Sequence, residues 1–331
     1  MRWPWLTLTL IAGYLWWCWR TLFANRGLVP FMPWVDVFEP QQRALIAWDG
    51  YEEILILSTD LYTSETTQVL EIMPLPSEPS VTAKGIDLFH RLNELINSLV
   101  GWDFSAKGTV RGVSFDQLGP AGEVTFHQQI GAHDISVTHL LRRDGFVSWA
   151  EDYLRTAGVS SPHIPADLAA IVQEYIDEGF NWFVFDVIST LPMLRTNEPI
   201  QYRFKSIKLY YPLRITRTAR GTTEIELYVL SRWHPNFMAH GIARDRISYR
   251  LRRDVQREAP LDAQTAAFLR RLNLIDPRDI DQSEGWVVSP EQLQFLDDEL
   301  AAFFKGHPKV LLQPWRIEGD LEAFDRDLLA Y

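Results

Sequence analysis

The chain has 331 residues, of which 47% are hydrophobic and 23% charged, with a formal net charge of −11 and one cysteine. This negative charge would repel a phosphate backbone, so the composition argues against nucleic-acid binding. A single cysteine, Cys18, excludes a disulfide within the chain and a zinc site built from several thiolates.

Residues 1–24 are predicted to be a transmembrane anchor. The apolar run, extended to Ala24, covers the roughly 30 Å of a bilayer as a helix. Its tryptophans form two groups, as at the two faces of a membrane: Trp3 and Trp5, then Trp16, Trp17 and Trp19. Long domains translocate largely regardless of flanking charge, so we expect a single-pass inner-membrane protein with its main domain on the periplasmic, extracytoplasmic side.

Two other interpretations of this segment stay open. Arg2 followed by an apolar run also suits a cleaved signal peptide, with the best cut after Ala24, although Leu22 is a poor match to the small residue expected there. A hydrophobic arm on a cytosolic protein is the third interpretation.

The anchor also carries small and hydroxyl side chains, which allow helices to approach closely and to form hydrogen bonds between them. We therefore expect lipid and partner-helix contacts at Trp3, Trp5, Thr9, Gly13, Trp16, Trp17 and Trp19. Interfacial anchoring alone is the simpler alternative.

Residues 25–40 contain three prolines, which predict a stiff linker between membrane and domain. Alternation and turn residues then predict strands at residues 42–48, 53–59, 68–73, 123–129, 133–139, 182–188, 202–205, 213–217 and 223–230. Asp49-Gly50 predicts a hairpin between the first two. Helices are predicted from Asp87 and over residues 144–157 and 165–178, with a loop at residues 101–122.

Residues 232–331 are predicted to form a mostly helical C-terminal extension. Helices are expected at residues 262–274 and 321–330, with a short strand at residues 310–313. Ser289 and Gln292 make a capping box around Pro290, which predicts a helix ending at Gly306.

Six patches occur in a characteristic order: VFEPQQRALIAWDG, MPLPSEPSV with DLFHRLNELI, QIGAHDISV, YIDEGFNWFVFDV, KLYYPLRIT and EIELYVLS. They resemble the domain-of-unknown-function 2330 family over about residues 35–231. Members are mostly exported bacterial or archaeal proteins without an assigned activity, so the resemblance implies export but no active site. The cysteine pair of many relatives is missing here, and VLEI replaces an aromatic strand.

The fold expected from these elements is α+β, with mixed or antiparallel sheets and flanking helices in a domain over residues 41–231, preceded by the transmembrane helix.

No catalytic, cofactor-binding or metal site is predicted. The sequence has no G-x-S-x-G, Walker or G-x-G-x-x-G motif. His127, His133 and His139 recur every six residues, but six residues of strand span about 20 Å, too far for one ion. Asp134 points away from its neighbour His133 on a strand, so we expect it to order a turn or to accept backbone N–H bonds.

Residues 244–257 reverse the charge of this acidic chain. They hold six arginines and two aspartates. One interpretation is a solvated face with internal ion pairs; the other is a docking patch for anionic lipid headgroups or an acidic partner. We expect the patch to be extended by exposed aromatic residues upstream, and to comprise Trp233, Phe237, Arg244, Arg246, Arg250, Arg252, Arg253 and Arg257.

The sequence thus favours a membrane-anchored, non-enzymatic accessory subunit whose tryptophan-rich helix packs into a larger membrane complex, such as a photosynthetic or respiratory one. A free-standing tethered periplasmic binding module is the alternative. A hydrolase with an unrecognised site is the least favoured hypothesis.

Overall fold

A computed structural model describes residues 28–32, 35–100, 123–140, 145–156, 163–218, 222–235, 237, 247–249 and 285–331. The predicted membrane segment, its seven contact residues, the loop at residues 101–122 and the helix at residues 262–274 lie outside these ranges. None of the helices in the described ranges has the length and apolar character needed to cross a membrane.

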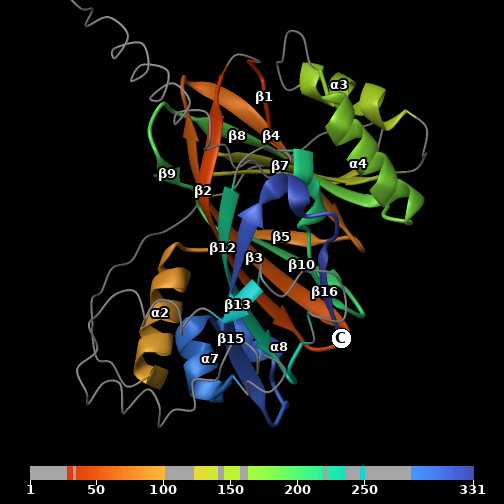
Figure 1. The fold of residues 1–331 in the computed structure, drawn as a ribbon. Coiled ribbons are helices and arrows are strands. Elements are labelled where there is room, and N and C mark those ends of the chain that lie inside the picture. The colour runs from red at the N-terminus through yellow and green to blue at the C-terminus, as the bar shows by residue number, and fades with distance from the viewer. Residues whose placement is uncertain are drawn as a thin grey trace, which may run out of the picture.

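The larger sheet has nine strands and mixed direction (Figure 1). Its main path follows the order β13-β15-β12-β2-β3-β10-β5, and β14 and β9 pair with β15 and β3. The strands are β2 (Val37–Trp48), β3 (Glu52–Thr63), β5 (Ser80–Ala83), β9 (Arg195–Thr196), β10 (Ile200–Lys205), β12 (Thr222–Ser231), β13 (Ile247–Tyr249), β14 (Trp286–Val288) and β15 (Val310–Asp320). Among the described strands of this sheet, β2 and β12 pair in parallel and the other pairs are antiparallel.

The smaller sheet has five antiparallel strands in the order β1-β4-β8-β7-β6. They are β1 (Leu28–Pro30), β4 (Thr67–Leu75), β6 (Glu123–Ile130), β7 (His133–His139) and β8 (Trp182–Thr190). A two-stranded sheet joins β11 (Leu209–Tyr211) to β16 (Leu328–Ala330).

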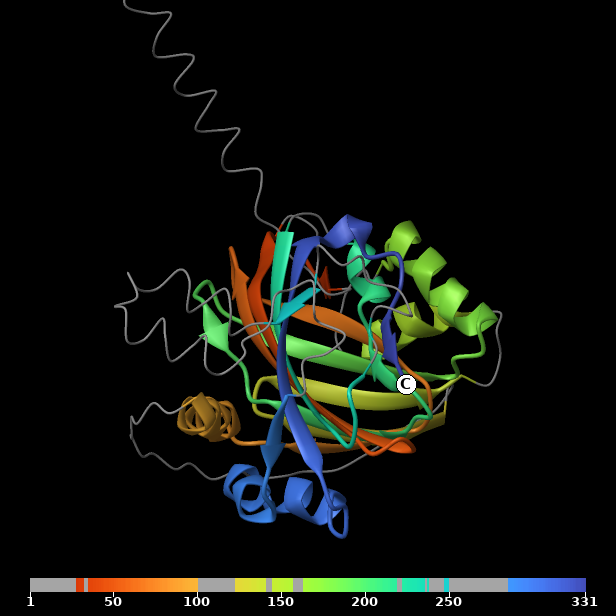
Figure 2. The same ribbon diagram turned by 60° about the horizontal axis from the view of Figure 1, so that its bottom comes forward.

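The helices lie in two groups on different sides of the sheets (Figures 1 and 2). α2 (Asp87–Val100), α7 (Pro290–Leu296) and α8 (Asp298–Phe303) pack on the larger sheet. α3 (Phe146–Thr156) and α4 (Ala166–Asp177) pack on the smaller one. A shared core lies between the sheets, where residues such as Ile46 and Leu55 meet Val137 and Val184. The predicted α+β class with mixed and antiparallel sheets is therefore correct.

Much of the predicted linker belongs to the folded domain. Within residues 25–40, β1 pairs with β4 and the first residues of β2 pair with β3. The prolines are compatible with this because Pro30 ends a three-residue edge strand and Pro40 lies at a register shift between Phe38 and Gln41. The described part of this segment is therefore not a spacer.

The prediction of a mostly helical C-terminal extension is wrong for the described residues. β15 pairs with β12 over ten residues and is an inner strand of the larger sheet. The predicted helix at residues 321–330 is a 3-10 turn, η4 (Leu321–Ala323), followed by β16. The capping box at Ser289 is present as predicted, although the helical region divides into α7 and α8 at Asp297. The C-terminal residues complete the domain.

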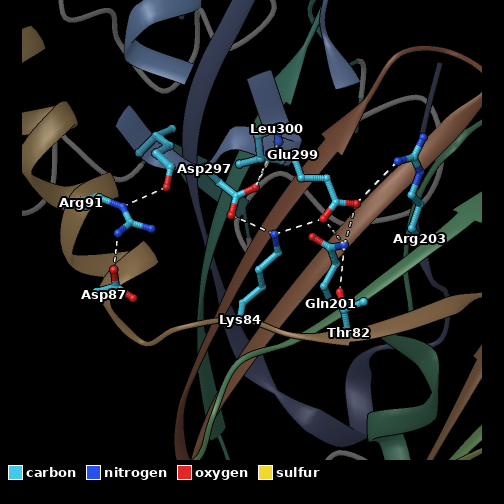
Figure 3. A network of polar contacts seen from close by, with 10 residues as sticks. Thr82, Lys84, Asp87, Arg91, Gln201, Arg203, Asp297, Glu299 and Leu300 are labelled. Carbon is cyan, nitrogen blue, oxygen red and sulfur yellow. Dashed lines mark hydrogen bonds and ion pairs between the residues drawn. The ribbon is translucent and has the colours of Figure 1, made fainter. Parts of the chain in front are cut away.

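A polar network holds α8 against the larger sheet (Figure 3). Lys84 Nζ lies 2.8 Å from Asp297 Oδ2 and 3.2 Å from Glu299 Oε2. Gln201 Nε2 donates to the Glu299 carboxylate at 3.0 Å, and Arg203 lies 3.5 Å from the same group. Charges of both signs are paired in it, so we assign the network a structural role.

Candidate functional site: an aromatic and basic end surface

Two turns meet at one end of the larger sheet. The first joins β2 to β3, where Asp49 Oδ1 accepts hydrogen bonds from the backbone N–H groups of Tyr51 and Glu52, both at 2.8 Å. Gly50 has a φ of 99°, a conformation that side chains disfavour, so the Asp-Gly pair suits this turn. The second turn follows β10 at Ser206.

Hydrogen bonds fasten the two turns together. The Trp48 indole donates to the Ser206 carbonyl at 3.0 Å, and the Ser206 N–H donates to the Tyr51 carbonyl at 2.8 Å. Trp233, just after β12, packs edge-on against Trp48 with ring centroids 5.3 Å apart. A Cβ at Gly50 would lie 2.7 Å from the Trp233 ring, so only glycine leaves room for this contact.

Exposed apolar side chains and cations gather on this framework. Tyr51, Ile207 and Tyr331 are 60%, 72% and 52% exposed, and Trp233 is 37% exposed. Each aromatic ring has a cation over it: Lys205 lies 6.0 Å from Tyr51, Lys208 4.8 Å from Tyr331 and Arg232 5.2 Å from Trp233. We define the end surface as Tyr51, Lys205, Ile207, Lys208, Arg232, Trp233 and Tyr331.

The three cations of the end surface are available to an outside partner. Among the described residues, no ion pair forms with Lys205, Lys208 or Arg232. The two acidic residues of the nearby turn are engaged elsewhere, since Asp49 caps the turn and Glu52 pairs with Arg203 at 2.7 Å. The end surface therefore carries local positive charge on a chain whose net charge is −11.

The structure places only part of the predicted docking patch. Trp233 belongs to the end surface, but Phe237 is 2% exposed and packs edge-on against Trp315, so its predicted exposure is wrong. The six arginines fall outside the residues whose side chains are described: Arg244, Arg246, Arg250, Arg252, Arg253 and Arg257. Their part in docking stays a prediction.

The other members of the end surface were missed because they are far apart in the sequence. The nearest signal is that apolar Ile207 stands between Lys205 and Lys208 in the segment KSIK, and that Tyr51 follows the turn residues Asp49 and Gly50.

The three histidines lie in different surroundings. His127 pairs with Asp134 from the neighbouring strand, and His139 stacks on Trp182 with centroids 4.3 Å apart. His133 Nδ1 lies 2.6 Å from Asp186 Oδ2. In the part of the chain that the structure describes, no group of three possible ligands could hold a metal ion. Asp134, for which the sequence predicts a role in ordering a turn or accepting backbone N–H bonds, lies in β7, and its side chain pairs with His127.

His133 and Asp186 form a buried pair in the smaller sheet. Burial alone would lower the pKa of His133, but Asp186, with smaller effects from Glu71 and Glu198, raises that pKa above its ordinary value. A His-Asp pair can orient a general base. Here only 6% and 4% of the two side chains are exposed, so a substrate could not approach them in this conformation.

Comparison with solved structures gives two matches with low scores. Two crystal structures of a mutated baculovirus P35 after caspase cleavage are similar to parts of the chain. One has 14% identity, a TM-score of 0.37 and coverage of 62% of this chain and 71% of that chain. The other has 12% identity, a TM-score of 0.32 and coverage of 57% and 66%. Scores this low support no conclusion about fold or function.

No curated protein matches the chain. The sequence profile described as "Uncharacterized protein conserved in bacteria (DUF2330)" matches residues 31–273, well over half of the 331 residues. The match includes the patches at residues 35–231 and continues beyond them. The chain therefore belongs to the DUF2330 family of bacterial proteins.

Proposed function

We propose that this protein is a membrane-tethered, extracytoplasmic, non-enzymatic accessory subunit that docks on a larger membrane assembly through its end surface. The observation that carries the proposal is the end surface itself, where three cations stand over three partly exposed aromatic rings. Aromatic residues and arginine are enriched in protein interfaces and supply much of their binding energy.

The charge of the end surface indicates the kind of partner. Its cations stand out against a net charge of −11, so an acidic protein surface would be attracted to this end and repelled elsewhere. The framework of hydrogen bonds at Ser206 and Asp49 holds the turns in place before binding. Such preorganisation lowers the entropy lost on association.

The tether is proposed from residues 1–24, whose two groups of tryptophans suit a helix held at fixed depth. A helix that packs among partner helices would add contacts to those of the end surface.

The test is purification of the full chain from its native membranes in mild detergent, with mass spectrometry of the co-migrating proteins and of the chain's own N-terminus. The expected result is a large species that contains the chain with its N-terminal segment intact. A small species, or a chain cut after Ala24, would contradict the proposal and favour the free-standing binding module.

A variant separates the two uses of the N-terminal segment. Replacement of Trp3, Trp5, Trp16 and Trp17 by leucine keeps the segment apolar, so membrane attachment is expected to persist. Assembly is expected to be lost, because the ring contacts with partner helices are removed. Unchanged assembly would show that the segment serves for anchoring alone.

A further inference from the structure

A second apolar feature lies in the loop between β8 and β9. Leu191, Met193 and Leu194 are 44%, 57% and 55% exposed, and Pro192 between them is exposed too. No other stretch of four residues in the described ranges holds three exposed large hydrophobic side chains. Exposed apolar clusters of this kind mark surfaces that contact another protein or a membrane.

The loop is fastened at both ends, so the exposure of its side chains is built into the fold. At its start, the Thr63 hydroxyl donates to the Leu191 carbonyl at 3.2 Å, and the hydroxyl of the preceding residue, Thr190, donates to the Thr67 carbonyl at 2.9 Å. After it, β9 pairs with β3, and the Thr196 hydroxyl donates to Asp60 at 2.7 Å.

The loop and the end surface lie at opposite ends of β3. The turn before Glu52 belongs to the end surface, and Leu61 pairs with Arg195 just after the loop. Nine residues of strand separate Glu52 from Leu61, which is roughly 30 Å. In Figure 1, β9 lies at the upper left and the C-terminus at the lower right.

The loop also lies within reach of the membrane to which the chain is proposed to be tethered. Leu28 of β1 pairs with Glu71 of β4, and Glu71 pairs with Asp186 of β8. Leu191, the first residue of the loop, comes five residues after Asp186. Those five residues span roughly 17 Å. Ala24, the end of the predicted anchor, is four residues before Leu28 and can lie up to about 14 Å from it. Anchor and loop can therefore meet one bilayer surface.

We propose that the loop of residues 191–194 inserts into the interfacial region of the bilayer as a second membrane contact. Its apolar side chains suit the boundary between headgroups and acyl chains, and Arg195, with 49% of its side chain exposed, would lie among anionic headgroups. The inference rests on the proposed tether. Two contacts fix the orientation of the domain, so the end surface points away from the membrane toward the extramembrane part of a partner.

The test places a fluorescent label in the loop of the full chain. The native cysteine is removed by Cys18→Ala, and Met193→Cys carries the polarity-sensitive dye NBD. The matched control is Val287→Cys, because Val287 is also 57% exposed but lies on β14, next to β15. Both chains are reconstituted into vesicles of phosphatidylcholine and phosphatidylglycerol, floated on a density gradient, and measured with and without doxyl-labelled lipid.

The expected result is flotation of both chains, with a blue-shifted emission that doxyl lipid quenches at position 193 but not at position 287. Flotation with equal, unquenched emission at both positions would overturn the loop contact while leaving the tether intact. A blue shift at position 193 that doxyl lipid leaves unquenched would overturn it too, because a protein segment or a second copy would then cover the loop. Failure of both chains to float would overturn the tether and this inference together.

Discussion

His133 and Asp186 form a charged pair inside the domain, with Nδ1 2.6 Å from Oδ2 and 5% and 3% of the residues exposed. The net pKa of His133 is raised, because Asp186 and the nearby Glu71 and Glu198 outweigh the effect of burial. A raised histidine pKa means that the folded state binds the proton more tightly than the unfolded state. The pair's contribution to stability is therefore complete below about pH 6.5, the unfolded pKa, and is lost as pH rises through the folded pKa.

The free energy of unfolding is accordingly expected to fall as pH rises above about 6.5. The measurement is denaturant unfolding of the full chain in mild detergent over a series of pH values. In His133→Gln the group that titrates is gone, so stability should be lower at acid pH and its decline with pH should be shallower. Equal declines in the wild type and His133→Gln would contradict this account.

Asp327 ties the end of the chain to the rest of the domain. Its Oδ1 accepts hydrogen bonds from the Tyr175 hydroxyl at 2.6 Å and from the backbone N–H groups of Leu213 and Arg214 at 3.0 and 2.9 Å. Asp327→Ala leaves these donors without their acceptor, which should cost about 3 kcal/mol of stability or more. Asp327→Asn keeps a carbonyl oxygen in that place, so its loss should be smaller.

Thermal unfolding of Asp327→Ala and Asp327→Asn measures the two losses of stability. Burial raises the pKa of Asp327 to about 6, so ionisation of Asp327 reduces stability as pH rises from about 4 to about 6. The two variants should therefore be compared with the wild type at one pH above that range. Equal losses for the alanine and asparagine variants would show that the acceptor oxygen contributes little.

Gly50 and Trp233 test the framework of the end surface. Gly50→Ala forces a side chain into a φ of 99° and places a Cβ 2.7 Å from the Trp233 ring. Gly179→Ala is the matched control, because Gly179 has a φ of 96° and nothing lies within 4 Å of its added Cβ. Backbone strain should cost each variant about 1–2 kcal/mol.

Gly50→Ala should lose more than Gly179→Ala in denaturant unfolding, because the Trp233 ring must move. This additional loss of stability should disappear in a chain that also carries Trp233→Ala. An excess that persists without the Trp233 ring would place the crowding elsewhere.

Local patterns predicted most of the fold correctly. The β-rich run at residues 53–59, the alternation at residues 68–73, the Asp49-Gly50 turn and the capping box at Ser289 each correspond to elements of the structure. In these segments the local preference and the final contacts agree.

The wrong predictions arise where contacts between residues far apart in the sequence determine the local structure. Residues 213–217 alternate like a strand, but Asp327 binds the backbone at Leu213 and Arg214, and the chain forms the 3-10 helix η1 (Arg214–Thr218). Leu321, Phe324 and Leu328 have helical spacing, yet all three are buried by a 3-10 turn and by β16. Phe237 is buried by Trp315, which is 78 positions further along the chain.

Pro314 hides the length of β15 in the sequence. Proline normally ends a strand, and the sequence predicts a strand only to Gln313. In the structure, β14 pairs with residues 310–312 of β15 and β13 with residues 315–317. Pro314 lies between the segment that pairs with β14 and the segment that pairs with β13. Neither of these strands therefore needs a backbone N–H at position 314. Such a gap depends on two remote segments, so the sequence could not reveal it.

The end surface was even less predictable, because four separate segments contribute to it. Trp233 was singled out from its neighbourhood, whereas Tyr51, Ile207 and Tyr331 come together only through the pairing of β2 with β3 and β11 with β16.

If the end surface binds an acidic partner, reversal of its charge should prevent docking. One variant reverses its three cations: Lys205→Glu, Lys208→Glu and Arg232→Glu. The control reverses two exposed cations that lie away from this end of the sheet: Arg155→Glu and Arg326→Glu. Exposed substitutions of this kind usually change stability by no more than about 0.5 kcal/mol, so both chains should fold.

The measurement is the fraction of each chain that migrates in the large species after extraction from native membranes in mild detergent. The end-surface variant is expected to move to a small species while the control stays with the wild type. An end-surface variant that assembles as fully as the wild type and the control would contradict it.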